Sequence, residues 1–198
     1  MGVLICLDPG HGGTDSGMVG SMFLEKDVCL DLAHRIEREL QKFEGIDVTL
    51  TRRYDVDLTN NERAGWANQR KADLFVSLHA DGMLDRDQSG FSTYVSVIAG
   101  SKVRRVQCFL HNQVTRFLRR FGICDLGKRN DTESKGGQII ELRSADMPAI
   151  TLALSSLPKG QNDELFSDLS FRDQYAKCIA CGLASIYECQ TKDSLDSF

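Results

Sequence analysis

Two histidines and one glutamate are the residues of this 198-residue chain whose types and spacing best suit catalysis. His11 follows a Pro-Gly turn that ends the apolar run Val3–Leu7, and His79 ends a second apolar run, Leu74–Leu78. Both runs are typical of strands buried in a parallel sheet, whose carboxyl ends meet where ligands bind. Glu25 opens the next helical segment across the same crevice. Two histidines and a carboxylate leave one position of a tetrahedral zinc ion open, so these residues predict a catalytic Zn²⁺ site.

Strand-like and helix-like segments alternate along the rest of the chain, and this predicts an α/β fold. We expect a single domain over residues 1–187, followed by a polar tail at 188–198. Its core should be a mainly parallel, twisted sheet of about six strands with helices on both faces. The expected strands are 3–7, 46–51, 74–79, 91–98, 138–143 and 149–154, and the expected helices are 25–43, 60–70, 101–121 and 172–187. Residues 124–137 are polar and rich in Gly, Ser and Lys, and are predicted to form a loop.

Further short motifs follow the first histidine in a fixed order, from about residue 3 to residue 187. They are Asp8-Pro9-Gly10-His11-Gly12-Gly13 with Asp15 and Gly17, Glu25-Lys26-Asp27, Thr51-Arg52, Leu58, Glu62-Arg63, Ala67-Asn68, Ala72-Asp73, Ser77-Leu78-His79-Ala80-Asp81 and Met147-Pro148-Ala149-Ile150. This ordered set resembles the zinc-dependent N-acetylmuramoyl-L-alanine amidases found in autolysins, spore-cortex enzymes and phage endolysins. The resemblance implies Zn²⁺ held by His11, Glu25 and His79. It also implies peptidoglycan or a muropeptide as substrate, cut between N-acetylmuramic acid and L-alanine.

One position departs from the pattern of that family. After the Pro-Ala pair the family has a strand ending in a glutamate that acts as the catalytic acid and base. The matching position here is Ala153, and a methyl group cannot take up or release a proton. Ser155 and Ser156 also replace the Gly-Phe pair that is usual in the family.

Four other polar residues are candidates for supporting roles. Glu141 is the acidic residue nearest to the missing position and could substitute for it, on a neighbouring strand and on the same face as Arg143. The alternative for Glu141 is an ordinary strand-end carboxylate paired with a Lys or Arg. Arg143 could bind an anionic part of the substrate or form a salt bridge at the end of the sheet. Asp8 and Asp15 could orient His11 or simply favour the turn.

Three functional hypotheses follow from these residues. The first is a peptidoglycan amidase whose acid/base group has been removed, either naturally or by an engineered Glu-to-Ala change at position 153. The second is a zinc-dependent peptidoglycan-binding or regulatory pseudoenzyme. The third is a metallohydrolase of another amide or peptide, in which Glu141 or a chain of water molecules moves protons.

Composition narrows the range of partners. A net charge of −4 argues against the binding of nucleic-acid phosphates as a main task. The chain has no apolar run long enough to cross a bilayer and no visible signal peptide. We therefore expect synthesis in the cytoplasm and access to the bacterial cell wall through phage lysis or an export route. The sequence does not indicate an oligomeric state.

Overall fold

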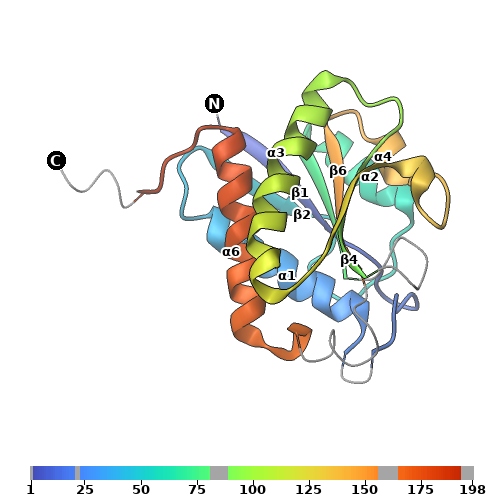
Figure 1. Cartoon of the computed structure of the whole chain (residues 1–198). Helices are drawn as coiled ribbons and strands as arrows, with labels where there is room; N and C mark the ends of the chain where they lie inside the picture. The colour runs from blue at the N-terminus through green and yellow to red at the C-terminus, as the bar shows by residue number, and fades with distance from the viewer. Residues whose placement is uncertain (1, 21–22, 81–88, 156–164, 193–198) are drawn as a thin grey trace.

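The central sheet has six strands in the order β2-β1-β3-β6-β4-β5, as predicted in number and in their mainly parallel arrangement (Figure 1). The computed structural model describes residues 2–20, 23–80, 89–155 and 165–192. The strands are β1 (Val3–Pro9), β2 (Ile46–Leu50), β3 (Leu74–His79), β4 (Gly90–Val95), β5 (Asp125–Asn130) and β6 (Ala149–Ser155). Neighbouring strands are parallel, except that β4 runs antiparallel to β6.

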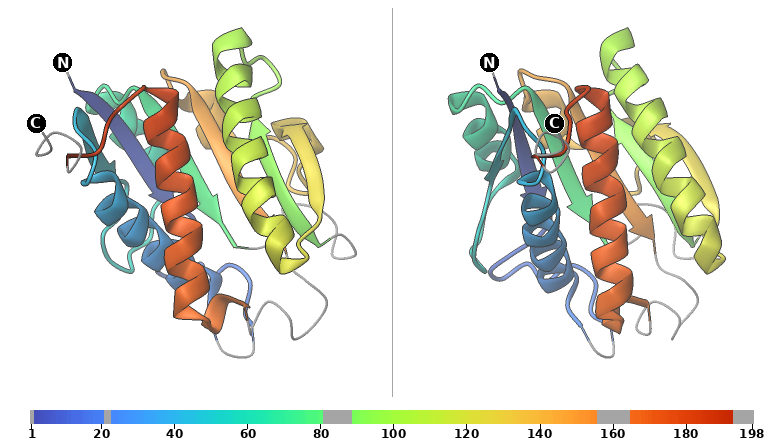
Figure 2. Two further views of the ribbon diagram at one scale, coloured as in Figure 1. Left: turned by 60° about the vertical axis from the view of Figure 1, so that its left-hand side comes forward. Right: turned by 90° about the vertical axis from the view of Figure 1, so that its left-hand side faces the viewer.

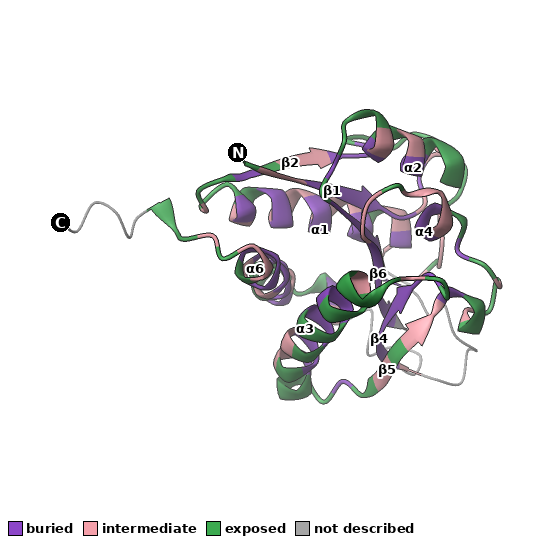
Figure 3. Cartoon of the chain, turned by 90° about the horizontal axis from the view of Figure 1, so that it is seen from above, coloured by how far each residue is buried: buried purple, intermediate pink, exposed green. Residues whose placement is uncertain are grey.

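Helices cover both faces of this sheet, which confirms the predicted α/β architecture. The helices are α1 (Glu25–Leu40), α2 (Asn60–Gln69), α3 (Ser101–Leu118), α4 (Ile140–Ser144) and α6 (Leu169–Ile186). Helices α1, α6 and α3 lie side by side on one face, and α2 and α4 lie on the other (Figures 2 and 3). We call the second side the α2/α4 face. Among the described residues, no helix is long and apolar enough to span a membrane.

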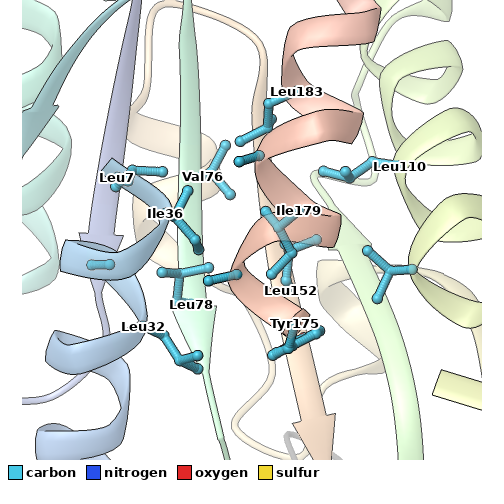
Figure 4. Close-up of a cluster of buried hydrophobic side chains, with 14 of the residues drawn as sticks. Leu7, Leu32, Ile36, Val76, Leu78, Leu110, Leu152, Tyr175, Ile179 and Leu183 are labelled. Carbon is cyan, nitrogen blue, oxygen red and sulfur yellow. The ribbon is translucent and has the colours of Figure 1, made fainter. Parts of the chain in front are cut away.

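Strand alternation divides the core between the two faces. Leu152 and Leu154 of β6 belong to the large cluster under α1, α3 and α6, where Leu152 lies near Ile179 of α6 (Figure 4). Ala153, between them in sequence, belongs to the smaller cluster on the α2/α4 face. Burial of each large aliphatic side chain contributes about 1.5–3 kcal/mol to the stability of the fold. A shift of β6 by one residue would turn its leucines away from the large cluster, so their burial fixes the register of the strand. Residue 153 must therefore face α2 and α4.

Two predicted segments differ from the structure. The predicted loop at 124–137 contains β5, which among the described strands pairs only with β4 and whose residues are exposed or half-buried. An edge strand facing solvent needs no apolar period, so its composition resembles that of a loop. The predicted strand at 138–143 is instead the short helix α4. A five-residue helix is too short for periodicity to distinguish it from a strand.

Both ends of the described chain meet the turn between α1 and β2. The amide of Val3 donates to the carbonyl of Gly45, at 2.7 Å. From the polar tail, the amide of Lys192 donates to the carbonyl of Lys42, and the carbonyl of Gln190 accepts from Glu44. Residues 193–198 of the tail lie outside the described residues. The two ends therefore lie at the edge of the sheet where β1 begins.

Candidate metal centre

His11 lies on a turn that two buried arginines hold in place. Arg63 donates to the carbonyls of Pro9 and His11, at 2.8 and 2.7 Å, and Arg52 donates to those of Pro9 and Gly10, at 3.0 and 2.8 Å. The backbone of His11 has a φ of 60°, a left-handed conformation that costs energy for a residue with a Cβ atom. These hydrogen bonds fix the carbonyls of the turn and so stabilise this conformation. The imidazole is thereby aimed across the carboxyl end of the sheet.

Glu25 and His79 meet His11 at that edge. Glu25 Oε1 lies 3.1 Å from His11 Nε2 and 3.3 Å from His79 Nδ1. One donor atom from each of the three residues lies within 4.8 Å of the others. Glu25 is buried at the start of α1, and its carboxylate also accepts hydrogen bonds from the amides of Ala80 and Met18, at 3.0 and 2.9 Å. The structure thus brings together all three predicted ligands, which we call the donor set.

The spacing of the donor set suits a zinc ion. Zinc–nitrogen and zinc–oxygen bonds of about 2.0–2.1 Å place neighbouring ligands of a tetrahedron roughly 3.3 Å apart. The two measured separations from Glu25 Oε1 are close to that edge length. A Cβ atom at Gly17 would lie 2.6 Å from Glu25 Oε2, and one at Gly10 would lie 2.8 Å from His79 Nε2. Glycine is therefore required at both positions for the ligands to approach.

Charge at the donor set favours a cation. Burial alone would lower the pKa of His11, but hydrogen bonds to Glu25 and Asp15 outweigh it and raise this pKa to about 9. Burial would raise the pKa of Glu25, whereas its hydrogen bonds with His11 and His79 hold that pKa well below its usual range. Glu25 is thus an ionised carboxylate in a buried position. A divalent cation between the imidazoles would neutralise that charge in the same way as the proton on His11.

Asp15 and Asp8 have different roles. Asp15 Oδ2 lies 2.8 Å from His11 Nδ1. An ionised carboxylate only accepts, so Nδ1 donates and Nε2 is left to face the donor set. Asp8 is fully buried, and its carboxylate accepts from Thr51 Oγ1, Arg63 Nη1 and Ser77 Oγ, at 2.6, 2.9 and 2.8 Å. Asp8 thus anchors Arg63, one of the two arginines that hold the turn, and does not orient the His11 ring directly.

Ala153 lies next to the donor set on the sheet. It is fully buried, and it is opposite His79 in the parallel β3–β6 pair and opposite Ser92 in the antiparallel β4–β6 pair. Alternation places the methyl group on the α2/α4 face with Thr151. Ser156, the second of the two serines noted above, lies outside the described residues.

Glu141 and Arg143 lie on α4, not on a strand as predicted. Residues two apart on a helix point about 200° apart, so the two side chains do not share a face. Arg143 pairs with buried Asp131 through its Nε atom. Arg143 also lines a pocket of about 150 Å³ together with Ala149. Ala149 is the first residue of β6, so this pocket lies near the opposite end of the strand from Ala153. The position favours the salt-bridge alternative for Arg143. Glu141 is buried, with an exposed fraction of 5%.

Arg52 and Arg63, which hold the His11 turn, have roles that could not be assigned from sequence. Both belong to the ordered motifs, but the carbonyls of the turn to which they donate are more than 40 residues away in sequence. An Arg directly after a strand and another in a capped helix were the available signals. The capping box itself is present, since Thr59 and Glu62 exchange hydrogen bonds at the start of α2.

Known proteins match this chain over nearly its whole length. The model of the N-acetylmuramoyl-L-alanine amidase family matches residues 5–185. The endolysin of Bacillus phage SPP1 is 32% identical over 194 residues, covering 97% of this chain and 69% of the endolysin. The amidase AmiC of Escherichia coli is 26% identical over 222 residues, and the match covers 93% of this chain but only 53% of AmiC.

A solved structure gives the same picture. The catalytic domain of CwlV, an N-acetylmuramoyl-L-alanine amidase from Bacillus (Paenibacillus) polymyxa var. colistinus, superposes with a TM-score of 0.81 at 28% identity. The superposition covers 95% of this chain and 99% of the CwlV domain. The family match, the fold and the converging donor set agree, and this chain belongs to the N-acetylmuramoyl-L-alanine amidase family.

Proposed function

We propose that this chain is a zinc-dependent amidase that hydrolyses the bond between N-acetylmuramic acid and the L-alanine of the peptidoglycan stem peptide. The observation that carries the proposal is the convergence of His11, Glu25 and His79 within 4.8 Å at the carboxyl edge of the sheet. Family membership supplies the substrate class. The likeness to the SPP1 endolysin and to the amidases AmiC and CwlV supports the same assignment.

Zinc in this position would polarise the scissile carbonyl and lower the pKa of a water molecule. Residues of the chain would orient the ligands and balance the charge of the metal ion. His11 is held by the turn and by Asp15 so that Nε2 faces the site, and buried Glu25 supplies the compensating negative charge. Because the His11 and His79 side chains are partly exposed and Glu25 is buried, the substrate amide would approach from the side of the two histidines.

The chain as written should be a slow form of such an enzyme. Amide nitrogen is a poor leaving group, so a group must take a proton from water and return it to the nitrogen. A positioned acid/base contributes about 10²–10⁴-fold to the rate, and the methyl group of Ala153 contributes nothing to either transfer. The buried, non-titratable residue at this position also favours a second candidate function, a peptidoglycan-binding pseudoenzyme.

The proposal is tested by metal content and by substrate recognition. Purified protein should hold about one zinc ion per chain. The double variant His11→Ala/His79→Ala should lose zinc binding, because it lacks two of the three proposed ligands. His34→Ala is the matched control, since the His34 side chain on α1 is partly exposed and pairs with Glu37, away from the donor set. Full zinc occupancy in the double variant would overturn the site.

Calorimetry with a muramoyl peptide, compared with the same peptide lacking the sugar, tests the substrate. Preference for the muramoyl form is expected. Equal affinity, or no binding of either, would contradict the proposed substrate. Binding without any release of L-alanine amino termini from cell walls, even by the Ala153→Glu variant, would favour the pseudoenzyme.

A further inference from the structure

A second carboxylate is buried on the side of the sheet where Ala153 lies. Glu141, on α4, is 5% exposed, and its Oε2 atom has no hydrogen-bond partner among the residues that the structure describes. Leaving a buried charged oxygen unpaired is expensive, so such groups are rare where only packing is at stake. Position 141 could hold an aliphatic side chain at no such cost. The carboxylate therefore calls for a functional explanation.

The surroundings of Glu141 place it on the same face of the sheet as Ala153. Helix α4 packs against β6 and α2, and Leu142 belongs to the same buried cluster as Ala153. The charges of Asp8, His79 and Arg63 all act on the Glu141 carboxyl, as expected for a group on the face of the sheet that α2 and α4 cover. Asp8 and Arg63 are already paired with each other, at 2.9 Å. Their mutual pairing leaves the Glu141 carboxyl near these charges without neutralising it.

Polar atoms without partners surround Ala153 on the same face. Ser92 is opposite Ala153 on β4, and Thr151 precedes it by two residues on β6. Within the described part of the chain, the hydroxyl oxygens of Ser92 and Thr151 are buried without a hydrogen-bond partner. Buried hydroxyls are normally satisfied by protein or water. The face of the sheet around the Ala153 methyl group therefore carries polar atoms without partners among the described residues, and Glu141 lies on the helix that packs against this strand.

We propose that Glu141 is the proton-transfer group of this chain and acts from α4 in place of a carboxylate at position 153. The inference rests on the proposed amidase function. It assigns to that reaction a residue on a different element from the one the family uses. Burial raises the pKa of Glu141, the charge of Asp8 raises it further, and this direction suits a group that must both accept and return a proton near neutral pH.

The two proton transfers by Glu141 balance. As the oxygen of the attacking water bonds to the amide carbon, one of the water's protons passes to the Glu141 carboxylate. When the carbon–nitrogen bond breaks, that proton passes from Glu141 to the departing nitrogen of L-alanine. The water oxygen and its second proton remain on the new carboxyl group of the lactyl chain. Glu141 returns to its ionised state, and no other reactant is needed.

The test compares four proteins: the chain as it stands, Glu141→Gln, Ala153→Glu, and the double variant Ala153→Glu/Glu141→Gln. Release of L-alanine amino termini from purified cell walls is measured for each with zinc present. We expect Glu141→Gln to lower the rate by about 10², the lower end of the usual worth of a positioned acid/base, because the carboxylate acts from a neighbouring element. The double variant should recover that loss, since the carboxylate introduced at position 153 would replace the one removed from position 141.

Readouts other than activity separate proton transfer from a structural role. Zinc content and the affinity for a muramoyl peptide should be unchanged in Glu141→Gln. Glu44→Gln is the matched control, because Glu44 is exposed near the opposite edge of the sheet. A fall in zinc content or in affinity that accounts for the lost rate would overturn the inference in favour of a structural role.

The outcomes also distinguish this inference from the proposed function. If the chain cleaves walls and Glu141→Gln does so equally fast, the Glu141 inference is wrong and the amidase assignment stands. If only the two proteins that carry the Ala153→Glu change are active, the Glu141 inference is again wrong and the amidase assignment again stands. If none of the four proteins cleaves walls, the amidase proposal itself fails.

Discussion

Ala153 and His79 are direct neighbours across the parallel β3–β6 pair, so the residue at position 153 lies one strand away from a proposed zinc ligand. Parallel strands are about 4.8 Å apart, a distance that a glutamate side chain can easily span. Both residues stand on the α2/α4 face at the carboxyl end of their strands. Position 153 is thus a place from which a carboxylate could reach the donor set.

Ala153→Glu should therefore accelerate amide hydrolysis. We expect a gain of roughly 10², the lower end of the range for a positioned acid/base, because Glu141 already carries part of the proton transfer. Loss of turbidity of purified cell walls would measure the rate. Ala153→Gln is the matched control, since it has nearly the same shape and cannot transfer protons. Equal rates for the Glu and Gln variants would show that position 153 does not face the reacting bond.

Asp15→Asn should weaken zinc binding without unfolding the protein. The Asp15 carboxylate accepts from His11 Nδ1 and thereby fixes the tautomer in which Nε2 faces the donor set. Loss of such an outer partner typically lowers metal affinity by about 10–100-fold. Competition with a chelator would measure the change. Asp27→Asn, at an exposed acidic residue in the first turn of α1, is the control and should bind zinc normally.

Arg63→Met should destabilise the fold strongly. The Arg63–Asp8 pair is buried, with side-chain exposed fractions of 6% and 1%. Removal of one partner leaves Asp8 charged and unpaired, which typically lowers the free energy of unfolding by about 3–5 kcal/mol. Arg119→Met is the control, because Arg119 is exposed and its ion pair with Asp125 spans 3.9 Å. An exposed pair contributes about 0–1 kcal/mol, so urea unfolding should separate the two variants clearly.

Glu141→Gln should change how stability depends on pH. Burial, assisted by the charge of Asp8, raises the pKa of Glu141 above the ordinary value of 4.5. Between the ordinary value and this raised value, the folded protein keeps a proton that the unfolded chain has released. The free energy of unfolding of the unmodified protein therefore falls as pH rises through this window.

The Gln variant lacks that titration. Urea unfolding of the zinc-free proteins should show a small difference at about pH 4 and a growing advantage of Glu141→Gln above it. Glu44→Gln should follow the unmodified protein at every pH. A constant difference between the unmodified protein and Glu141→Gln across this range would contradict the raised pKa.

The convergence of the donor set could be predicted from the sequence because strand ends and a helix start determine the positions of its three residues locally. His11 and His79 follow apolar runs that can only be buried strands, and Glu25 opens a strongly periodic helix. Their meeting point then follows from the parallel sheet. The segments whose prediction was wrong lack such a signal, since β5 is a solvent-facing edge and α4 has only five residues.

Burial of Glu141 and the roles of Arg52 and Arg63 could not be predicted in this way. Each depends on contacts between segments far apart in the chain, such as the 52 residues between Arg63 and the carbonyl of His11. Periodicity describes which face of an element is apolar, but not which backbone atoms a long side chain reaches. Because a strand is predicted where α4 forms, the predicted placement of Glu141 beside Arg143 is wrong as well.

The meeting of Val3, Gln190 and Lys192 with the α1–β2 turn has a practical consequence. This turn lies where β1 begins, whereas the donor set lies where β1 ends, and seven residues of strand span about 20 Å. A tag, a second domain or a solid support joined directly before Val3 or directly after Lys192 would therefore sit on the side away from the donor set. Immobilised through these positions, the domain would present its donor set outward, toward a particle as large as a cell-wall fragment.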